Sequence, residues 1–346
     1  MFEHLDDPRP PVFGAAARHA VVRRVHRRRR RQLAGGMGVA AATLVAGAGG
    51  LYGRAAWRLG QVERTEVAGT ADVPAGEPVT FLVRGVDART GPDDAGRSDT
   101  LLLARLDPGA GTASLLSLPR DLLVTDPATG ADVRVNVLGA DAQVAVAESQ
   151  LGVPVDHVVE VGLDGFRALV DLVGGVEVRV DAAVRDTRSG LFLDELGCVT
   201  LDGEEALALV RSRHRETLDD SGRWVVDPMA DLGRAATQRA VVVAALADLA
   251  GRADPISVDR LAGWLAEHVT VDAALDAGDL ADLVRAALAV DPAAVTVAQL
   301  PVTIAPGDDS RLAVDETLAP AVVDAFRTGE PAPAGPLEGE PAVAAC

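Results

Sequence analysis

Acidic and arginine side chains that suit the binding of a phosphorylated ligand recur along this chain. Asp87 and Asp99 bracket an eleven-residue loop that carries Arg97. Further arginines follow at Arg120, Arg211, Arg213 and Arg234. Paired carboxylates bind Mg²⁺, and clustered guanidinium groups bind phosphate oxygens. The alternative interpretation is that the aspartates cap turns and the arginines are solvated.

Both aspartates lie at the ends of predicted β-strands. Apolar residues 81–86 lead into Asp87, residues 100–106 follow Asp99, and residues 112–118 run back after a turn rich in Gly and Pro. If these strands pair as a meander, both aspartates lie at one end of it. Arg120 returns to the same end, because Pro119 ends the third strand. The meander therefore predicts that two carboxylates and an arginine lie together.

Arg211 and Arg213 follow a short predicted helix, residues 204–210. Residues two apart on a helix point about 200° away from each other, whereas in an extended segment they point the same way. Joint action of the two arginines therefore requires the helix to end near Val210. Arginines solvated at a helix end are the alternative.

Arg234 and Gln238 are four residues apart in a helix predicted over residues 231–250, so they share a face. They lie near the helix N-terminus, where free N–H groups and the helix dipole favour anions. A solvated start of a surface helix is the alternative.

Strands and helices alternate through the chain, which predicts a single α/β domain with a mixed sheet flanked by helices. Further strands are predicted at residues 156–161, 176–180 and 294–300, and further helices at 144–151, 163–173, 258–268, 277–289 and 317–328. His157, at the start of a strand, is expected to be structural rather than catalytic.

The charge distribution argues against a nucleic-acid partner. The net charge is −18 over 346 residues, all 33 basic residues are arginine, and residues 55–346 hold 23 arginines against 48 acidic residues. Nucleic-acid binding needs a broad basic surface instead. The chain also lacks a Gly-x-Ser-x-Gly elbow, a Walker loop and His/Cys pairs with metal-ligand spacing. A serine or zinc hydrolase is therefore not supported.

The N-terminal segment predicts a membrane anchor. Eight arginines lie between Arg18 and Arg31, and residues 33–53 are 21 uncharged residues, enough to span about 30 Å as a helix. The basic flank places the N-terminus in the cytoplasm. We expect a cytoplasmic tail (1–32), a transmembrane helix (33–53), a tether (54–77), an extracytoplasmic domain (78–328) and a disordered Pro/Ala-rich tail (329–346). A cleaved signal peptide is the alternative to the anchor.

Two cysteines, Cys198 and Cys346, are compatible with an oxidising compartment outside the membrane. They either form one disulfide or are two unrelated thiols.

A series of short motifs occurs in order along the chain. The motifs are Gly85-Val-Asp-Ala-Arg89, Gly96-Arg-Ser-Asp-Thr100, Ser117-Leu-Pro-Arg-Asp121, Arg134-Val-Asn136, Asp156-His157, Gly165-Phe166, Asp171-Leu-Val-Gly-Gly-Val176, Leu201-Asp-Gly203, Ala206-Leu207, Arg211-Ser-Arg213 and Asp231-Leu-Gly-Arg234 with Gln238. Together they resemble the LytR-CpsA-Psr family over roughly residues 79–250, in what looks like an actinobacterial member.

The resemblance implies a membrane-anchored enzyme that moves a glycopolymer from a polyprenyl-pyrophosphate carrier to peptidoglycan. The products would be a phosphodiester link and polyprenyl phosphate. Asp87 and Asp99 would bind Mg²⁺, with Mn²⁺ as the alternative, and would act in catalysis with Arg120, Arg211 and Arg213. The pyrophosphate would be bound by Arg89, Arg97, Arg120, Arg134, Arg211, Arg213, Arg234 and Gln238. Residues 163–173 and 241–249 are candidates to line a tunnel for the prenyl chain, or else ordinary core.

Three positions depart from the family pattern: Thr237 replaces an arginine, Gly162 replaces an acid, and residues 137–139 replace an Ala/Gly-rich stretch. Two other functions therefore stay open. The chain could be a non-catalytic sensor of lipid-linked envelope precursors, or a hydrolase of polyprenyl pyrophosphate.

Overall fold

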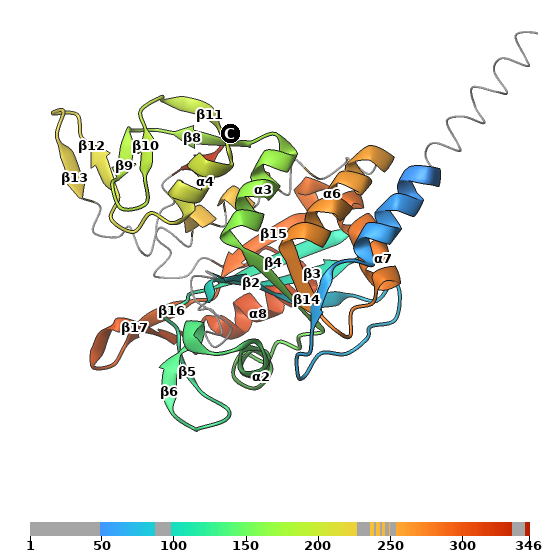
Figure 1. Cartoon of the computed structure of the whole chain (residues 1–346). Helices are drawn as coiled ribbons and strands as arrows, with labels where there is room; N and C mark the ends of the chain where they lie inside the picture. The colour runs from blue at the N-terminus through green and yellow to red at the C-terminus, as the bar shows by residue number, and fades with distance from the viewer. Residues whose placement is uncertain are drawn as a thin grey trace, which may run out of the picture. The chain divides into compact units, whose positions relative to one another are not determined.

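The computed structural model describes residues 49–86, 98–226, 236–333 and 343–346, apart from positions 239, 243, 246–248 and 250–253. Residues Gly53–Cys346 form one compact unit. Its centre is a seven-stranded mixed sheet of order β1-β14-β7-β2-β3-β4-β15 (Figure 1). The strands are β1 (Glu63–Thr65), β14 (Val269–Asp272), β7 (His157–Gly162), β2 (Val79–Val86), β3 (Ser98–Asp107), β4 (Thr112–Leu118) and β15 (Val295–Gln299).

The predicted meander is confirmed. Strands β2, β3 and β4 pair antiparallel in sequence order, with Gly85 opposite Thr100 and Leu101 opposite Leu118. The parallel pairs β2–β7 and β4–β15 join the meander to the later strands. This register brings the start of β3 and the end of β4 to the same end of the sheet.

Helices cover both faces of the sheet because its strands are apolar on both sides (Figure 1). On one face, Leu82, Leu103 and Leu116 pack with Val144 of α2 (Ala140–Gln150) and Val322 of α8 (Ala319–Thr328). On the other face, strand residues of β2, β7 and β14 pack against α6 (Pro255–His268) and α7 (Ala277–Ala289). The predicted α/β class with a mixed sheet is thus confirmed.

A second group of elements lies beside the central sheet, around the helices α3 (Leu163–Val173) and α4 (Gly203–Val210). One sheet, of order β10-β9-β12-β13, consists of Leu191–Leu193, Val184–Asp186, Glu216–Leu218 and Trp224–Val226. The other, of order β11-β8-β18, consists of Gly197–Leu201, Val176–Val180 and Ala344–Ala345.

Short elements complete the described fold. Two two-stranded sheets pair β5 (Leu123–Thr125) with β6 (Asp132–Arg134) and β16 (Val302–Ala305) with β17 (Asp308–Val314). The 3-10 helices are Val135–Val137 and Pro292–Ala294.

The predicted tether at residues 54–77 is wrong, because this segment belongs to the fold. Residues 53–59 are helical, and Ala55, Leu59 and Val62 are buried among residues of α6, α7 and β14. Strand β1 then adds to the edge of the central sheet, parallel to β14. Ala55 and Leu59 lie four residues apart on the helix, so they give it a buried face, which a solvated tether would not need.

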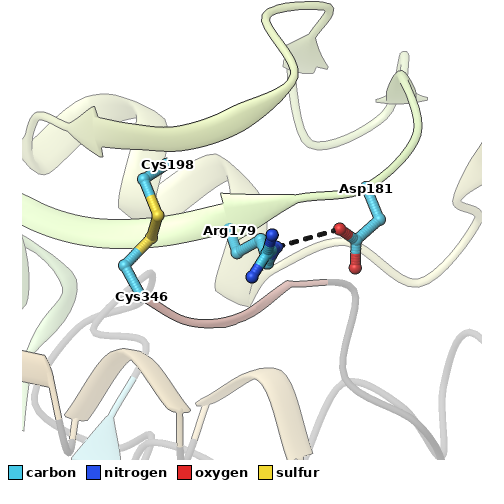
Figure 2. The surroundings of a disulfide bond; sticks show 4 residues. All are labelled: Arg179, Asp181, Cys198 and Cys346. Atoms are coloured by element: carbon cyan, nitrogen blue, oxygen red, sulfur yellow. Dashed lines mark ion pairs between the residues drawn. A yellow bond between two sulfur atoms is a disulfide. The ribbon is translucent and has the colours of Figure 1, made fainter.

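The prediction of a disordered tail at residues 329–346 is wrong at the end of the chain. Strand β18 pairs with β8, and Val343 is buried. Cys346 forms a disulfide with Cys198, with the two Cα atoms 5.9 Å apart, as Figure 2 shows beside the Arg179–Asp181 ion pair. Of the two interpretations of the cysteines, the disulfide is therefore correct.

Removal of this disulfide is expected to destabilise the domain markedly. The bond joins residues 148 positions apart, so its loss frees a long loop in the unfolded chain and should lower the free energy of unfolding by about 2–5 kcal/mol. Urea unfolding of Cys346→Ser and of the reduced wild type measures this loss. Both should shift equally, and an unchanged midpoint in both would contradict the expectation.

The predicted membrane span lies mostly outside the described residues, which include only its positions 49–53, all helical. None of the described helices combines the length and the apolar character that a bilayer crossing needs. The span at residues 33–53 stays a prediction.

Candidate functional site

A cavity of about 960 Å³ opens between the central sheet and the helices α3, α4, α6 and α7. Its volume lies at the upper end of the range for ligand sites. Apolar side chains make up most of the lining, and charged and polar side chains gather among them. The sequence-predicted members of this polar group are Asp99, Arg120, Arg134, Arg211, Arg213 and Gln238.

Asp99 is the meeting point of two arginines that are distant in sequence. Its Oδ1 accepts a hydrogen bond from Arg120 Nη1 at 2.8 Å and another from Arg213 Nη2 at 3.1 Å. Asp99 lies near the start of β3, and Arg120 lies two residues after the end of β4. The antiparallel pairing of these strands therefore brings them together, as the meander predicted.

A second carboxylate extends this cluster toward Arg134. Asp121 Oδ2 lies 3.3 Å from Arg120 Nε, and its Oδ1 lies 3.5 Å from Arg134 Nε. The backbone N–H of Asn136 donates to the Arg120 carbonyl at 3.3 Å. These ion pairs and this backbone hydrogen bond join the segment after β4 to the segment around Arg134. Sequence reasoning did not assign Asp121 a role, although it stands next to Arg120.

The helix before Arg211 ends where joint action of the two arginines requires it to end. Helix α4 begins with a capping box between Asp202 and Glu205 and ends at Val210. Gln238 Nε2 donates to the Val210 carbonyl at 3.1 Å, so it satisfies a terminal helix acceptor while it lines the cavity. Beyond this point the chain leaves the helix, and both Arg211 and Arg213 line the cavity.

Four predicted site residues lie outside the described residues: Asp87, Arg89, Arg97 and Arg234. Their assignments as metal or phosphate ligands stay predictions. Strand β2 ends at Val86, immediately before Asp87, and strand β3 begins at Ser98, immediately after Arg97.

Arg84 is a cavity-lining arginine that sequence reasoning missed. It forms an ion pair with Glu160, and its Nε donates to Gln143 Oε1 at 2.7 Å. Gln143 in turn donates to Ser98 Oγ at 2.8 Å, next to Asp99. Burial, partly offset by Asp141, lowers the pKa of Arg84 to about 10, so it stays protonated at neutral pH. A charged residue within an apolar strand was the available signal.

His157 is structural, as expected. It is buried, and its Nδ1 lies 3.2 Å from both carboxylate oxygens of Asp272, a residue with no exposed surface. Asp272 also accepts from the Val158 N–H at 2.8 Å. The pair joins β7 to β14 within the central sheet and does not line the cavity.

Two of the departures from the family pattern have distinct surroundings. Thr237 is 1% exposed and is not among the described residues that line the cavity. Gly162 does line it and precedes the first turn of α3. An acid at position 162 would therefore border the cavity, whereas the side chain at position 237 faces the packed interior.

The donor atoms fit a hard divalent cation. Among the described lining residues, the carboxylates are Asp99 and Asp121, and Mg²⁺ needs only one or two carboxylates when water and phosphate oxygens complete its shell. A grouping of Glu177 with Cys198 and Cys346 elsewhere is no competing site, because both thiols are in the disulfide. Of these two, Asp99 is the carboxylate that the sequence analysis predicts as a metal ligand.

The apolar lining includes the two segments proposed for a prenyl chain. Leu163, Phe166 and Leu169 from α3 and Val242 and Leu249 from the helical residues after Gln238 all line the cavity. Trp264 and Leu265 of α6 and Leu288 of α7 line it as well. One cavity thus combines an arginine–carboxylate cluster with an extended apolar wall.

Comparison with known proteins gives consistent matches. TagU of Bacillus mycoides (strain KBAB4), named a polyisoprenyl-teichoic acid–peptidoglycan teichoic acid transferase, is 35% identical over 181 residues, 51% of this chain and 54% of that protein. The protein of the same name from Halalkalibacterium halodurans is 35% identical over 156 residues, 44% and 50% of the two chains. This chain therefore spans about half the length of the curated relatives it matches.

Solved structures share the fold. A LytR-Csp2A-Psr enzyme from Actinomyces oris matches with a TM-score of 0.63 and 30% identity, over 78% of this chain and 95% of that one. B. subtilis TagV matches with a TM-score of 0.59 and 24% identity, over 73% and 97%. The model of the LytR_cpsA_psr family matches residues 56–319, which include the sheet, the cavity and all the described site residues. The chain belongs to the LytR_cpsA_psr family.

Proposed function

We propose that this protein transfers a glycopolymer from a polyprenyl-pyrophosphate carrier to peptidoglycan. The observation that carries the proposal is the convergence of Arg120 and Arg213 on Asp99 within a largely apolar cavity. Arginines suit the pyrophosphate, and the apolar wall suits a prenyl chain. The name of the Bacillus mycoides relative, a polyisoprenyl-teichoic acid–peptidoglycan teichoic acid transferase, supports the same activity.

The reaction joins an acceptor hydroxyl to the phosphorus atom that carries the glycan. A new P–O bond forms to the hydroxyl oxygen, and the bond from that phosphorus to the bridging oxygen breaks. Polyprenyl phosphate leaves with the bridging oxygen, and the hydroxyl proton passes to a base. Phosphoryl transfer of this kind depends mainly on positioning and on neutralisation of charge.

The described arginines supply these two requirements. Arg120 and Arg213 both donate to Asp99, so their guanidinium groups are already oriented before a ligand binds. A phosphate oxygen that binds there does not have to order them. Arg134 and Arg211 border the same cavity. Mg²⁺, or Mn²⁺ in its place, when bound at Asp99 would supply further neutralisation of the pyrophosphate.

We further propose that residues 33–53 anchor the protein in the cell membrane, with residues 1–32 in the cytoplasm and the domain outside. A prenyl carrier is itself held in the membrane, so an anchor would keep the cavity within reach of it. The disulfide Cys198–Cys346 is consistent with an oxidising exterior.

The test uses the full chain in detergent, because residues 55–65 pack into the domain. It is incubated with a polyprenyl-pyrophosphate-linked oligosaccharide, a peptidoglycan fragment and Mg²⁺, and both polyprenyl phosphate and product mass are followed. We expect release of polyprenyl phosphate with the glycan joined to the acceptor. Release without joining would instead identify a hydrolase, and lipid binding without release would identify a sensor.

A further inference from the structure

Asp186 is a buried carboxylate outside the cavity lining, at the end of β9. It is 2% exposed, and four donors converge on it. Its Oδ2 accepts from Ser212 Oγ at 3.0 Å, from the Arg213 N–H at 3.0 Å and from the His214 N–H at 2.9 Å. Its Oδ1 accepts from the Arg188 N–H at 2.9 Å.

Three of these donors belong to the segment that carries the cavity arginines. Helix α4 has ended at Val210, so the amide groups of residues 213 and 214 no longer have helical acceptors. One carboxylate oxygen replaces those acceptors for both amides. Gln238 satisfies the Val210 carbonyl on the other side of Arg211. The non-helical course of the backbone through Arg213 is therefore fixed from two directions.

The same backbone determines where the Arg213 guanidinium lies. Its Nη2 reaches Asp99 Oδ1 at 3.1 Å while the Arg213 amide is bound to Asp186. Arginine loses considerable rotamer entropy when it is held in place. Because the backbone at Arg213 is fixed, its side chain samples fewer positions in the free protein. It therefore loses less conformational entropy when a phosphate binds.

The charge state of Asp186 agrees with this arrangement. Burial alone would raise the pKa of the carboxyl, but the hydrogen bonds from His214, Arg188, Ser212 and Arg213 lower it further than burial raises it. The group is thus an anion stabilised by hydrogen-bond donors, and charge-assisted bonds of this kind are stronger than neutral ones. Asp186 therefore holds the segment firmly at neutral pH.

We propose that Asp186 is a positioning residue for pyrophosphate binding, and that it acts through the backbone of Arg213. This inference rests on the proposed function, because it takes the cavity arginines to be the phosphate ligands. Asp186 itself does not touch the substrate. Its loss should weaken the contribution of Arg213 and leave the other phosphate contacts in place.

The test measures binding of geranylgeranyl pyrophosphate with Mg²⁺ to the full chain by titration calorimetry. Four proteins form a cycle: wild type, Asp186→Asn, Arg213→Ala and the double variant. We expect Asp186→Asn to weaken binding about tenfold or more. In the Arg213→Ala background the same change should weaken binding less than about twofold, because the side chain through which it acts is gone.

Asp219 provides a matched control. It too accepts several hydrogen bonds in a turn, from Ser221 and from the Arg223 N–H, but it lies between β12 and β13 and is not among the described cavity-lining residues. Asp219→Asn should leave binding unchanged. An equal loss of affinity from Asp186→Asn in both backgrounds would show a general structural role and overturn the proposal.

Hydrogen exchange in the ligand-free protein separates this inference from the proposed function. The Arg213 and His214 amides should exchange faster in Asp186→Asn than in the wild type, and unchanged exchange would overturn the positioning role.

If Arg213→Ala does not weaken lipid binding, the proposed phosphate site fails, and the positioning role fails with it. If Arg213→Ala weakens binding and Asp186→Asn does not, only the positioning role fails. Should Asp186→Asn not fold, Ser212→Ala removes one donor and should give a smaller loss of affinity that also disappears in the Arg213→Ala background.

Discussion

Replacement of Asp99 with alanine is expected to lower the rate of the proposed glycopolymer transfer by about a thousandfold or more. Asp99 is the shared acceptor of Arg120 and Arg213 and the described carboxylate predicted as a metal ligand. Its loss would remove a ligand of the proposed Mg²⁺ and would release both guanidinium groups from their common acceptor. Initial rates of polyprenyl phosphate release, measured over a range of Mg²⁺ concentrations, test the expectation.

The fold should survive this substitution. The Asp99 side chain is 36% exposed, so its ion pairs resemble surface pairs, and the free energy of unfolding should change by less than about 1 kcal/mol. Asp99→Asn keeps the acceptor geometry toward the arginines without the full charge. It should regain part of the activity only at high Mg²⁺. Wild-type rates in both variants would contradict a role of Asp99 in the proposed reaction.

Replacement of Asp272 with alanine is expected to lower the free energy of unfolding by about 3–5 kcal/mol. The carboxylate has no exposed surface, and it accepts from His157, from the Val158 N–H and from the Ala274 N–H. Alanine would leave these donors without their acceptor in the packed interior. Chemical denaturation of the purified variant measures the loss.

Asp276 is the matched control for Asp272. It is an exposed N-cap of α7 that accepts from the Gly278 and Asp279 N–H groups, and its replacement by alanine should cost only about 1 kcal/mol. Equal losses in the two variants would contradict a central role for the buried pair.

The stability that Asp272 contributes should depend on pH. Burial alone would raise the pKa of this carboxyl, but the hydrogen bonds from His157 and from the Val158 and Ala274 N–H groups hold it below its ordinary range. A depressed folded-state pKa gives stability that is present above the unfolded pKa of about 3.9 and is lost as the pH falls through the folded pKa. The difference in unfolding free energy between wild type and Asp272→Ala should therefore be constant near neutrality and shrink below about pH 4. A difference that grows on acidification would contradict the assignment.

The described part of the site was predictable where local geometry determined it. Alternation, turn residues and Pro119 were enough to define the meander, and the meander alone brings Arg120 to Asp99. Two-residue spacing made joint action of Arg211 and Arg213 depend on a helix end near Val210, because the two side chains diverge on a helix, and α4 does end at Val210. These inferences used only the periods of helix and strand, which the sequence displays directly.

Features that depend on distant partners were not predictable in the same way. Residues 54–65 contain apolar positions, but the burial of those positions depends on α6, α7 and β14, some 200 residues further along the chain. The strands of the β10-β9-β12-β13 sheet are three residues each, too short to show a period. The tail resembled a disordered segment because its composition gives no sign of the pairing of β18 with β8.

Two of the missed polar residues, Arg84 and Asp186, have partners that no sequence motif or spacing connects to them. Arg84 is satisfied by Glu160 and Gln143, which lie on separate elements. Asp186 lies 26 residues before Ser212, with no spacing rule to connect them. Such contacts become visible only when the chain has folded.

The most direct measurement is a crystal structure of the protein with geranylgeranyl pyrophosphate and Mn²⁺, whose anomalous scattering locates the metal. We expect an anomalous peak beside Asp99, pyrophosphate oxygens bound by Arg120 and Arg213, and the prenyl chain along Leu163, Phe166 and Leu249. A pyrophosphate bound away from this cluster, or a prenyl chain outside the cavity, would contradict the proposed carrier site.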